Sequence, residues 1–299
     1  MDTNILLENG TNELEVLEFT IDGNSYGINV AKVREIIPYH PVTPVPNSHT
    51  CIEGIFMPRD VMITAINLPR YLHLRENADV KNDMMIITNF NKLDISFHVD
   101  KVLGIHRVSW ADIITPDNTI NTADSSISTG VIKIDGKLII ILDFEKIVTD
   151  ISPETGLKVS DIDKLGVRNR SESPILTVED SPLLGKLIRD SLIKAGYTNI
   201  LTASNGQQAW DMLSKMKEEG NVLNKVKCII TDIEMPIMDG HRLTKLVKTD
   251  SVLESIPLII FSSLVNSEMR LKGEALGANA QLSKPEIGQL VELIDGLIK

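Results

Sequence analysis

Residues 228–240 read CIITDIEMPIMDG, and the fold predicted for the second half of the chain rests on this stretch. Its first four residues are apolar or β-branched, which is typical of a short buried strand. Asp232 follows this strand directly, and a helix is predicted for residues 240–248. A buried strand, a loop that carries an acid and a helix form one unit of an alternating β/α pattern.

The same unit recurs before and after this stretch. Residues 175–178 form an apolar run, and Ser181 and Pro182 then offer a helix N-cap and a proline at the first helical position. The helix that follows is predicted to end at Gly196. Five such units predict an α/β fold with a doubly wound parallel sheet. Further strands are predicted at residues 200–203, 258–261 and 280–282, and further helices at residues 207–219, 267–276 and 286–298.

Three acidic residues follow strands that are predicted to be neighbours in this sheet. Glu179 and Asp180 end the first strand, and Asp232 ends the third. Because ligands of such sheets bind at the carboxyl ends of the strands, we expect these carboxylates to converge. A hard divalent cation relieves the repulsion between them, and Mg²⁺ suits a set of oxygen ligands. The alternative is that the acids only cap helices, as Asp180 could do.

A hydroxyl and an ammonium group are predicted on the same rim. Ser262 ends the fourth strand, and Lys284 with Pro285 follows the fifth. A carboxylate, a metal ion, a cation and a hydroxyl together suit phosphoryl transfer onto the carboxylate. Taken singly, each residue is more simply explained as a cap or a solvated loop residue. Their joint occurrence at the predicted strand ends, in the right order, favours the functional interpretation.

The first half of the chain predicts short strands. Leu14 and Val16 alternate with acids, and the alternation slips at Leu17, which is what a β-bulge leaves in a sequence pattern. Asp22-Gly23-Asn24 is a turn signal, and Asp135-Gly136 predicts a hairpin. Other strands are predicted at residues 61–66, 84–88, 95–99, 102–108, 131–134 and 138–142.

Little helix is predicted in this half. Residues 30–37 are expected to be helical until Pro38 stops them, and a short turn is expected after Leu142. The many short strands predict an all-β barrel or sandwich. Charges, Ser and Pro then dominate residues 151–173, which predict a linker, with Ile162 on one short helical turn.

Composition excludes several classes of protein. The chain has 299 residues and a net charge of −11, with 13 basic and 22 acidic side chains in residues 1–160. Neither half offers a basic surface, which argues against a nucleic-acid partner. Because no apolar run approaches the roughly 20 residues of a membrane span, we expect no direct membrane insertion. The acidic residues 1–15 predict no secretory signal, and two cysteines suit a reducing compartment, so a cytoplasmic protein is expected.

Residues 174–299 resemble a response-regulator receiver domain of the CheY type. The matching segments are ILTVEDSP, IITDIEMPIMDG, IPLIIFSS and LGANAQLSKP. The resemblance implies that Asp232 is the phospho-acceptor, that Ser262 turns toward the phosphoryl group and that Lys284 bridges it. It also implies that Mg²⁺ is held by Glu179, Asp180, Asp232 and the backbone carbonyl of Glu234. The chain departs from the usual pattern at two positions, with Gln281 where receivers commonly carry an aromatic switch residue and Leu264 where many carry a polar one.

Residues 13–150 resemble the CheW family of chemotaxis scaffolds. The matching segments are LEFTIDGNSYGINVAKVREII, IEGIFMPRDVMITAINL and GVIKIDGKLIIILDFEKIV. The resemblance implies two small SH3-like β-barrels. It places the arginine of the family's central motif at Arg59, which we expect to contact a partner, although Met57 and Asp60 replace the family's Asn and Gly.

A CheW-like domain (13–150), a linker (151–173) and a receiver (174–299) are the architecture of the CheV family. This resemblance implies a coupling protein, not an independent enzyme, that is recruited to receptor arrays and links chemoreceptors to the histidine kinase CheA. Phosphotransfer from CheA to Asp232 is expected to modulate the link. One alternative is a phosphate sink for CheA. Another is an aspartyl-phosphate phosphatase, which usually needs a second Asp where this chain has Glu234. A transcription factor is disfavoured by charge and domain order.

Overall fold

The computed structural model describes residues 12–77, 79–90, 93–114, 127–153, 160–166, 168–264 and 267–298. The chain divides into two compact units. The first consists of Leu14–Thr155, and the second consists of Gly156–Lys299 together with Met1–Glu13. Most of the acidic N-terminal stretch and part of the predicted linker lie outside the described residues. No helix in the described ranges is long and apolar enough to cross a membrane.

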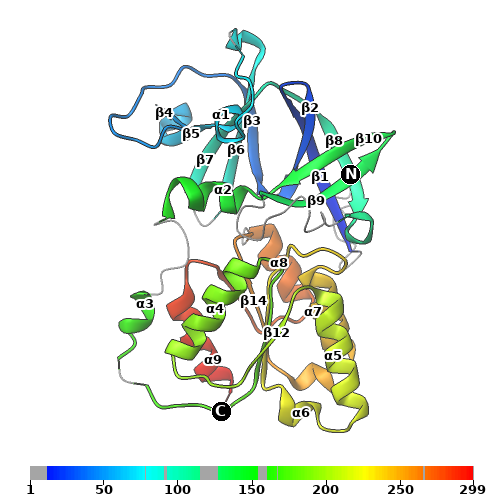
Figure 1. The fold of residues 1–299 in the computed structure, drawn as a ribbon. Coiled ribbons are helices and arrows are strands. Elements are labelled where there is room, and N and C mark those ends of the chain that lie inside the picture. Colours follow the sequence, from blue (N-terminus) through cyan, green and yellow to red (C-terminus); the bar gives the residue numbers. More distant parts are fainter. Residues whose placement is uncertain are drawn as a thin grey trace. The chain divides into compact units, whose positions relative to one another are not determined.

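The first unit contains two five-stranded sheets (Figure 1). One has the order β8-β1-β2-β10-β9 and the other the order β3-β6-β7-β5-β4. In the first sheet the strands are β1 (Glu13–Ile21), β2 (Asn24–Asn29), β8 (Lys101–Ser109), β9 (Ser128–Ile134) and β10 (Lys137–Leu142). In the second they are β3 (Val33–Pro38), β4 (Ile52–Phe56), β5 (Ile63–Asn67), β6 (Met84–Phe90) and β7 (Leu93–Val99). The predicted all-β fold of this half is confirmed.

The pairing of strand β1 with β2 shows no bulge at the slip in the sequence pattern. It runs without a register shift from Val16 to Ile21. Val16 packs in one cluster of buried residues, with Trp110 and Ile139, whereas Leu17 packs in another, with Phe19. Both faces of the strand are therefore buried, each against a different cluster, and the hydrophobic alternation changes face where one cluster gives way to the other.

The helix predicted for residues 30–37 is wrong. Only a single 3₁₀ turn, η2 (Val30–Lys32), forms there, and residues 33–38 then make strand β3. Strand β3 pairs antiparallel with β6, with Ile36 opposite Ile86 and Ile37 opposite Met85. Branched residues such as Ile36 and Ile37 fit a pleated sheet well, and tertiary pairing overrode a helical spacing too short to stand alone.

Two elements of this unit lack a clear sequence signal. Strand β4 was not predicted. Its sequence is IEGIF, and the acidic residue and the glycine interrupt the alternation of apolar and polar residues. Helix α2 (Phe144–Ile151) is longer than the predicted turn and is capped by Asp143, whose side chain accepts from Lys146 N–H at 2.9 Å. Phe144 and Ile147 of this helix pack in the main cluster together with residues of both sheets. A short helix α1 (Leu68–Tyr71) completes the unit.

The second unit is the predicted doubly wound sheet. Five parallel strands lie in the order β12-β11-β13-β14-β15, with helices α4 and α9 on one face and α5 and α7 on the other (Figure 1). The strands are β11 (Ile175–Val178), β12 (Ile200–Ala203), β13 (Cys228–Thr231), β14 (Leu258–Ser262) and β15 (Ala280–Ser283). The long helices are α4 (Pro182–Lys194), α5 (Gly206–Glu218), α7 (Gly240–Thr249), α8 (Ser267–Ala275) and α9 (Ile287–Leu297). A short helix α6 (Val222–Lys225) was not predicted.

The helical turn predicted near Ile162 is present as α3 (Ser160–Asp163). Ile162 is almost fully buried and belongs to the same cluster as Ile175, Leu290 and Ile294. Arg168, a little further on, donates to the Ala195 carbonyl at 2.8 Å. This part of the predicted linker therefore packs as a part of the second unit.

Candidate functional site

The order of strands brings the predicted acidic residues to one edge of the sheet. Strand β13 lies between β11 and β14, and Val178 is paired with Thr231. The residues that follow these two positions are Glu179 and Asp232, so both side chains start from the same level of the sheet. Ser181 caps helix α4 and Pro182 opens it, so Glu179 and Asp180 are the first two residues of a short connection between β11 and α4.

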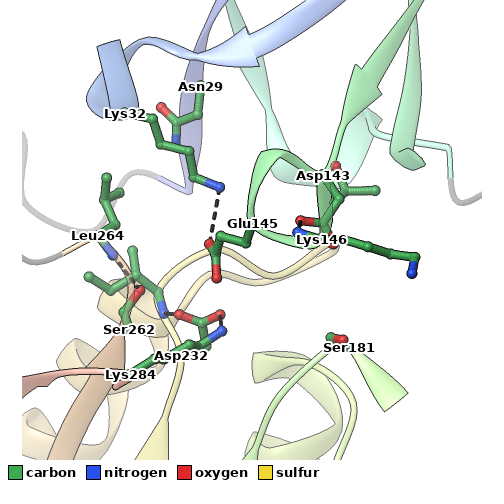
Figure 2. Close-up of polar contacts among 12 residues, drawn as sticks. Asn29, Lys32, Asp143, Glu145, Lys146, Ser181, Asp232, Ser262, Leu264 and Lys284 are labelled. Atoms are coloured by element: carbon green, nitrogen blue, oxygen red, sulfur yellow. Dashed lines mark hydrogen bonds and ion pairs between the residues drawn. The ribbon is translucent and has the colours of Figure 1, made fainter. Parts of the chain in front are cut away.

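The carboxylates converge as the sequence predicts. One oxygen from each of Glu179, Asp180 and Asp232 lies within 4.8 Å of the others. Lys284, which follows β15, reaches the same place, with its Nζ 2.7 Å from Asp232 Oδ2 and 3.1 Å from Glu179 Oε2. Figure 2 shows Lys284 beside Asp232. Both partners of the Lys284–Asp232 pair are about 5% exposed, so this is a buried ion pair.

Like charges are gathered at this edge. The carboxylates of Glu179, Asp180 and Asp232 lie close together, and Lys284 brings its ammonium group to two of them. Burying such charges is costly unless opposite charges or hydrogen bonds compensate them. The Ile233 N–H donates to Asp232 Oδ1 at 2.6 Å, which compensates part of the charge. The donor set consists of oxygens alone, which is the set that a hard divalent cation of the Mg²⁺ class prefers. The residues present therefore fit such an ion.

Ser262 lies at the end of β14 and is fully buried. Its Oγ accepts from the Leu264 N–H at 3.2 Å, and the Leu264 side chain is buried as well (Figure 2). Gln281 lies on β15 against α8, where its Nε2 donates to the Arg270 carbonyl at 2.6 Å. A Cβ on Gly273 would lie 2.5–2.7 Å from the Gln281 amide atoms, so this glycine makes room for it.

Gly240 is a further residue of this site that the sequence reasoning did not single out. A Cβ at this position would lie 1.8 Å from the carbonyl oxygen of Asp232. The Gly240 N–H donates to the Ile233 carbonyl at 2.9 Å, so the first residue of α7 is in direct contact with the residues that follow β13. The signal in the sequence is the Asp-Gly pair, in which Asp239 caps α7 by accepting from the Arg242 N–H at 2.6 Å.

Arg59 belongs to the first unit and is not among the residues that converge at the acidic edge. It lies in the 3₁₀ turn η3 (Pro58–Asp60), where Arg59 and Asp60 both have a positive φ, of 55° and 61°. The Arg59 side chain is 81% exposed and its Nη2 lies 2.8 Å from Glu35 Oε1. Two methionines in the same loop, Met57 and Met62, are also exposed. The loop thus presents a cation between apolar side chains.

The two units correspond to two known domain families. Residues 15–152 match the CheW-like domain, and residues 175–295 match the response regulator receiver domain. The chain is 31% identical to the chemotaxis protein CheV3 of Helicobacter pylori over 96% of this chain and 95% of that protein. It is 31% identical to the chemotaxis protein CheW of Thermotoga maritima over 50% of this chain and 98% of that protein. A chemotaxis protein CheY homolog of Campylobacter jejuni is 30% identical over 40% of this chain and 85% of that protein.

These matches define a CheW-like domain followed by a receiver domain. Because the likeness to CheV3 extends over nearly the whole of both proteins, the chain belongs to the CheV family of chemotaxis proteins.

Proposed function

We propose that this protein is a phosphorylatable coupling protein that links chemoreceptors to the histidine kinase CheA. The observation that carries the proposal is the buried pair of Lys284 and Asp232 at the edge of a receiver sheet, with Glu179 and Asp180 beside it. A reactive carboxylate with a fixed cation is what phosphoryl transfer requires, and membership of the CheV family supplies the chemotaxis context.

In the proposed reaction an oxygen of Asp232 attacks the phosphorus of a phosphohistidine on the kinase. A P–O bond forms, the P–N bond breaks and the histidine nitrogen regains a proton. Lys284, already 2.7 Å from Asp232 Oδ2, pairs with the added phosphoryl oxygens. Ser262 then turns its hydroxyl from the Leu264 N–H toward the same oxygens.

Glu179, Asp180, Asp232 and the backbone carbonyl of Glu234 are the groups that would hold Mg²⁺. When bound, the ion neutralises charge on the phosphoryl oxygens during transfer. In the first unit, the exposed Arg59 with its flanking methionines is the surface that we assign to the partner. Arginine and methionine are both common at protein interfaces, because each offers a large contact area and can adapt its shape.

The test of the site is labelling of Asp232 with acetyl phosphate and Mg²⁺. We expect a base-labile, acid-stable acyl phosphate that is lost on chelation of Mg²⁺ and in Asp232→Asn. The matched control is Asp211→Asn, which changes an exposed aspartate on α5. The assignment of Asp232 is wrong if Asp232→Asn is labelled to the extent of the wild type.

The test of coupling is CheA activity in receptor-containing membranes, with and without phospho-donor. A coupling protein changes the receptor control of CheA when Asp232 is phosphorylated. A phosphate sink instead drains phosphoryl groups and leaves the receptor control of CheA unchanged. The second result would exclude the coupling role while keeping Asp232 as the acceptor.

A further inference from the structure

The loop between β13 and α7 is tied to Asp232 at both of its ends. At its start, the Ile233 N–H donates to the Asp232 carboxylate. At its end, the Gly240 N–H donates to the Ile233 carbonyl, and Gly240 is in such close contact with the Asp232 backbone that no side chain fits between them. A rearrangement at the Asp232 carboxylate therefore reaches both ends of the loop.

The middle of the loop is a tight turn in an unfavourable conformation. The Met238 N–H donates to the Pro236 carbonyl at 2.7 Å, which closes a three-residue γ-turn around Ile237. Ile237 has a φ of +69°, a region that branched residues rarely adopt, and γ-turns of this hand are rare and strained. Such a conformation persists only where neighbouring groups hold it.

The side chain of Asn12, far away in the sequence, stabilises this turn, and we call its two hydrogen bonds to the loop the Asn12 hold. Its Nδ2 donates to the Ile237 carbonyl at 2.9 Å, and its Oδ1 accepts from the Asp239 N–H at 3.0 Å. One carboxamide thus spans the second half of the strained turn with two hydrogen bonds. Asn12 itself has a φ of +62°, which asparagine tolerates better than other residues that have a Cβ.

We propose that the β13–α7 loop is a binding site for the Asn12 carboxamide, and that phosphorylation of Asp232 weakens the two hydrogen bonds of this contact. The second half of the proposal rests on the proposed function. In the unmodified protein the two Asp232 oxygens bind the Ile233 N–H and Lys284. Transfer of a phosphoryl group to either oxygen forces at least one of these contacts to be remade.

The two-point geometry makes the hold sensitive to this change. The Ile237 carbonyl and the Asp239 N–H match one carboxamide only while the turn keeps its present shape. Because Asn12 directly precedes β1 in the chain, the hold also gives a covalent route from the loop to the first unit. The phosphorylation state of Asp232 then changes how strongly the loop binds Asn12, the residue that precedes β1.

The first experiment uses the unmodified full-length protein and measures hydrogen exchange of the Asp239 amide by NMR. Asn12→Gly keeps the backbone free to adopt a positive φ and removes only the carboxamide. Its matched control is Asn47→Gly, at an exposed asparagine with a φ of 59°. We expect the Asp239 amide to exchange about tenfold faster in Asn12→Gly, as the loss of one hydrogen bond implies, and at the wild-type rate in Asn47→Gly. If the Asp239 amide exchanges at the wild-type rate in Asn12→Gly, the Asn12 side chain does not stabilise the loop and the proposal is wrong.

The second experiment adds beryllofluoride and Mg²⁺ as a phosphoryl mimic. In the wild type, exchange of the Asp239 amide is expected to rise, and in Asp232→Asn it is expected to stay constant. Because coupling is reciprocal, Asn12→Gly is expected to bind beryllofluoride more tightly than the wild type. Binding that leaves the Asp239 amide unchanged would overturn the coupling. If beryllofluoride does not bind, the proposed function fails. The first experiment still tests whether Asn12 binds the loop, because it uses the unmodified protein.

Discussion

Two buried histidines have opposite electrostatic surroundings. His98, on β7, lies between two carboxylates, with Nδ1 2.8 Å from Glu53 Oε1 and Nε2 2.9 Å from Asp83 Oδ2. A ring that donates from both nitrogens must be protonated. His241, on α7, is equally buried, but its Nε2 has no hydrogen-bond partner among the described residues, and the cation of Lys272 disfavours its protonated form. The same residue type is thus held charged in one unit and neutral in the other.

His241 makes the second unit sensitive to acid. Burial, together with the Lys272 charge, lowers the pKa of His241 to about 3, whereas in the unfolded chain it is 6.5. The unfolded state therefore takes up the proton first, and stability falls by roughly 1.4 kcal/mol for each pH unit below 6.5. We expect His241→Leu to lose this part of the pH dependence.

The measurement is urea unfolding at pH 7.5 and 5.5 in a Trp110→Phe background, where Trp210 of α5 is the one remaining tryptophan. The control is His40→Leu, which removes an exposed histidine from the first unit. If His241→Leu and wild type lose the same stability between the two pH values, His241 is not the acid-sensitive group.

His98 gives the first unit the opposite pH dependence. Burial alone would lower the pKa of His98, but the hydrogen bonds and charges of Glu53 and Asp83 outweigh it, so the pKa is raised. The stabilisation is complete below pH 6.5 and is lost as the pH rises through the raised value. His98→Leu strands two buried carboxylates, and we expect it to cost about 3 kcal/mol at pH 6.

Unfolding of a Trp210→Phe variant, followed by Trp110, measures this effect. The wild-type first unit is expected to weaken as the pH rises from 6.5 through the raised pKa of His98, and His98→Leu is expected to show no such trend. If the wild type and His98→Leu have the same pH dependence, His98 is not the group responsible.

At the scale of elements, helix α3 shows how a short segment acquires a fixed place. Four residues cannot form a stable helix alone. Ile162 is 3% exposed because it packs in one cluster with Leu290, Val291 and Ile294 of α9. Helix α3 is therefore stabilised by packing and not by its own helix propensity.

This packing predicts that Ile162→Ala weakens the second unit by about 3 kcal/mol, as for other large-to-small changes in a core. The matched control is Ile193→Ala on α4, whose side chain is 48% exposed, and it is expected to change stability much less. Urea unfolding followed by Trp210 measures both. An equal effect of the two substitutions would show that α3 does not contribute to the stability of the unit.

At the scale of the whole molecule, the two units have separate hydrophobic clusters and carry separate proposed functions. We expect Arg59→Glu to weaken binding of CheA or receptor and to leave labelling of Asp232 by acetyl phosphate intact. Asp232→Ala is expected to keep basal binding and lose its response to the phospho-donor. The physical reason is that a modification shifts a binding equilibrium only through states that it stabilises differently.

Pull-downs of both variants, with and without donor, measure this separation, with Arg75→Glu as an exposed arginine control in the first unit. The two-unit interpretation has to be abandoned if Arg59→Glu abolishes labelling or if Asp232→Ala abolishes basal binding.

The amino-acid pattern was enough to predict the doubly wound sheet of the second unit and the acidic residues at its edge. Each βα unit there is local, with its own apolar run, cap and terminator, and parallel topology brings the strand ends together. Glu179, Asp232 and Lys284 could therefore be placed before their distances were known. The all-β character of the first unit could be predicted for the same local reasons, from alternation and turn residues such as Asp135-Gly136.

Other features could not be predicted from the amino-acid pattern, because they depend on which surfaces meet in the folded chain. Residues 33–38 became a strand because β6 pairs with them, and β1 has two buried faces because each meets a different cluster. The hold of Asn12 on Ile237 joins residues 225 positions apart, and no local pattern encodes it. Periodicity records how a residue faces its neighbours in the chain, whereas these contacts follow from packing between segments far apart in sequence.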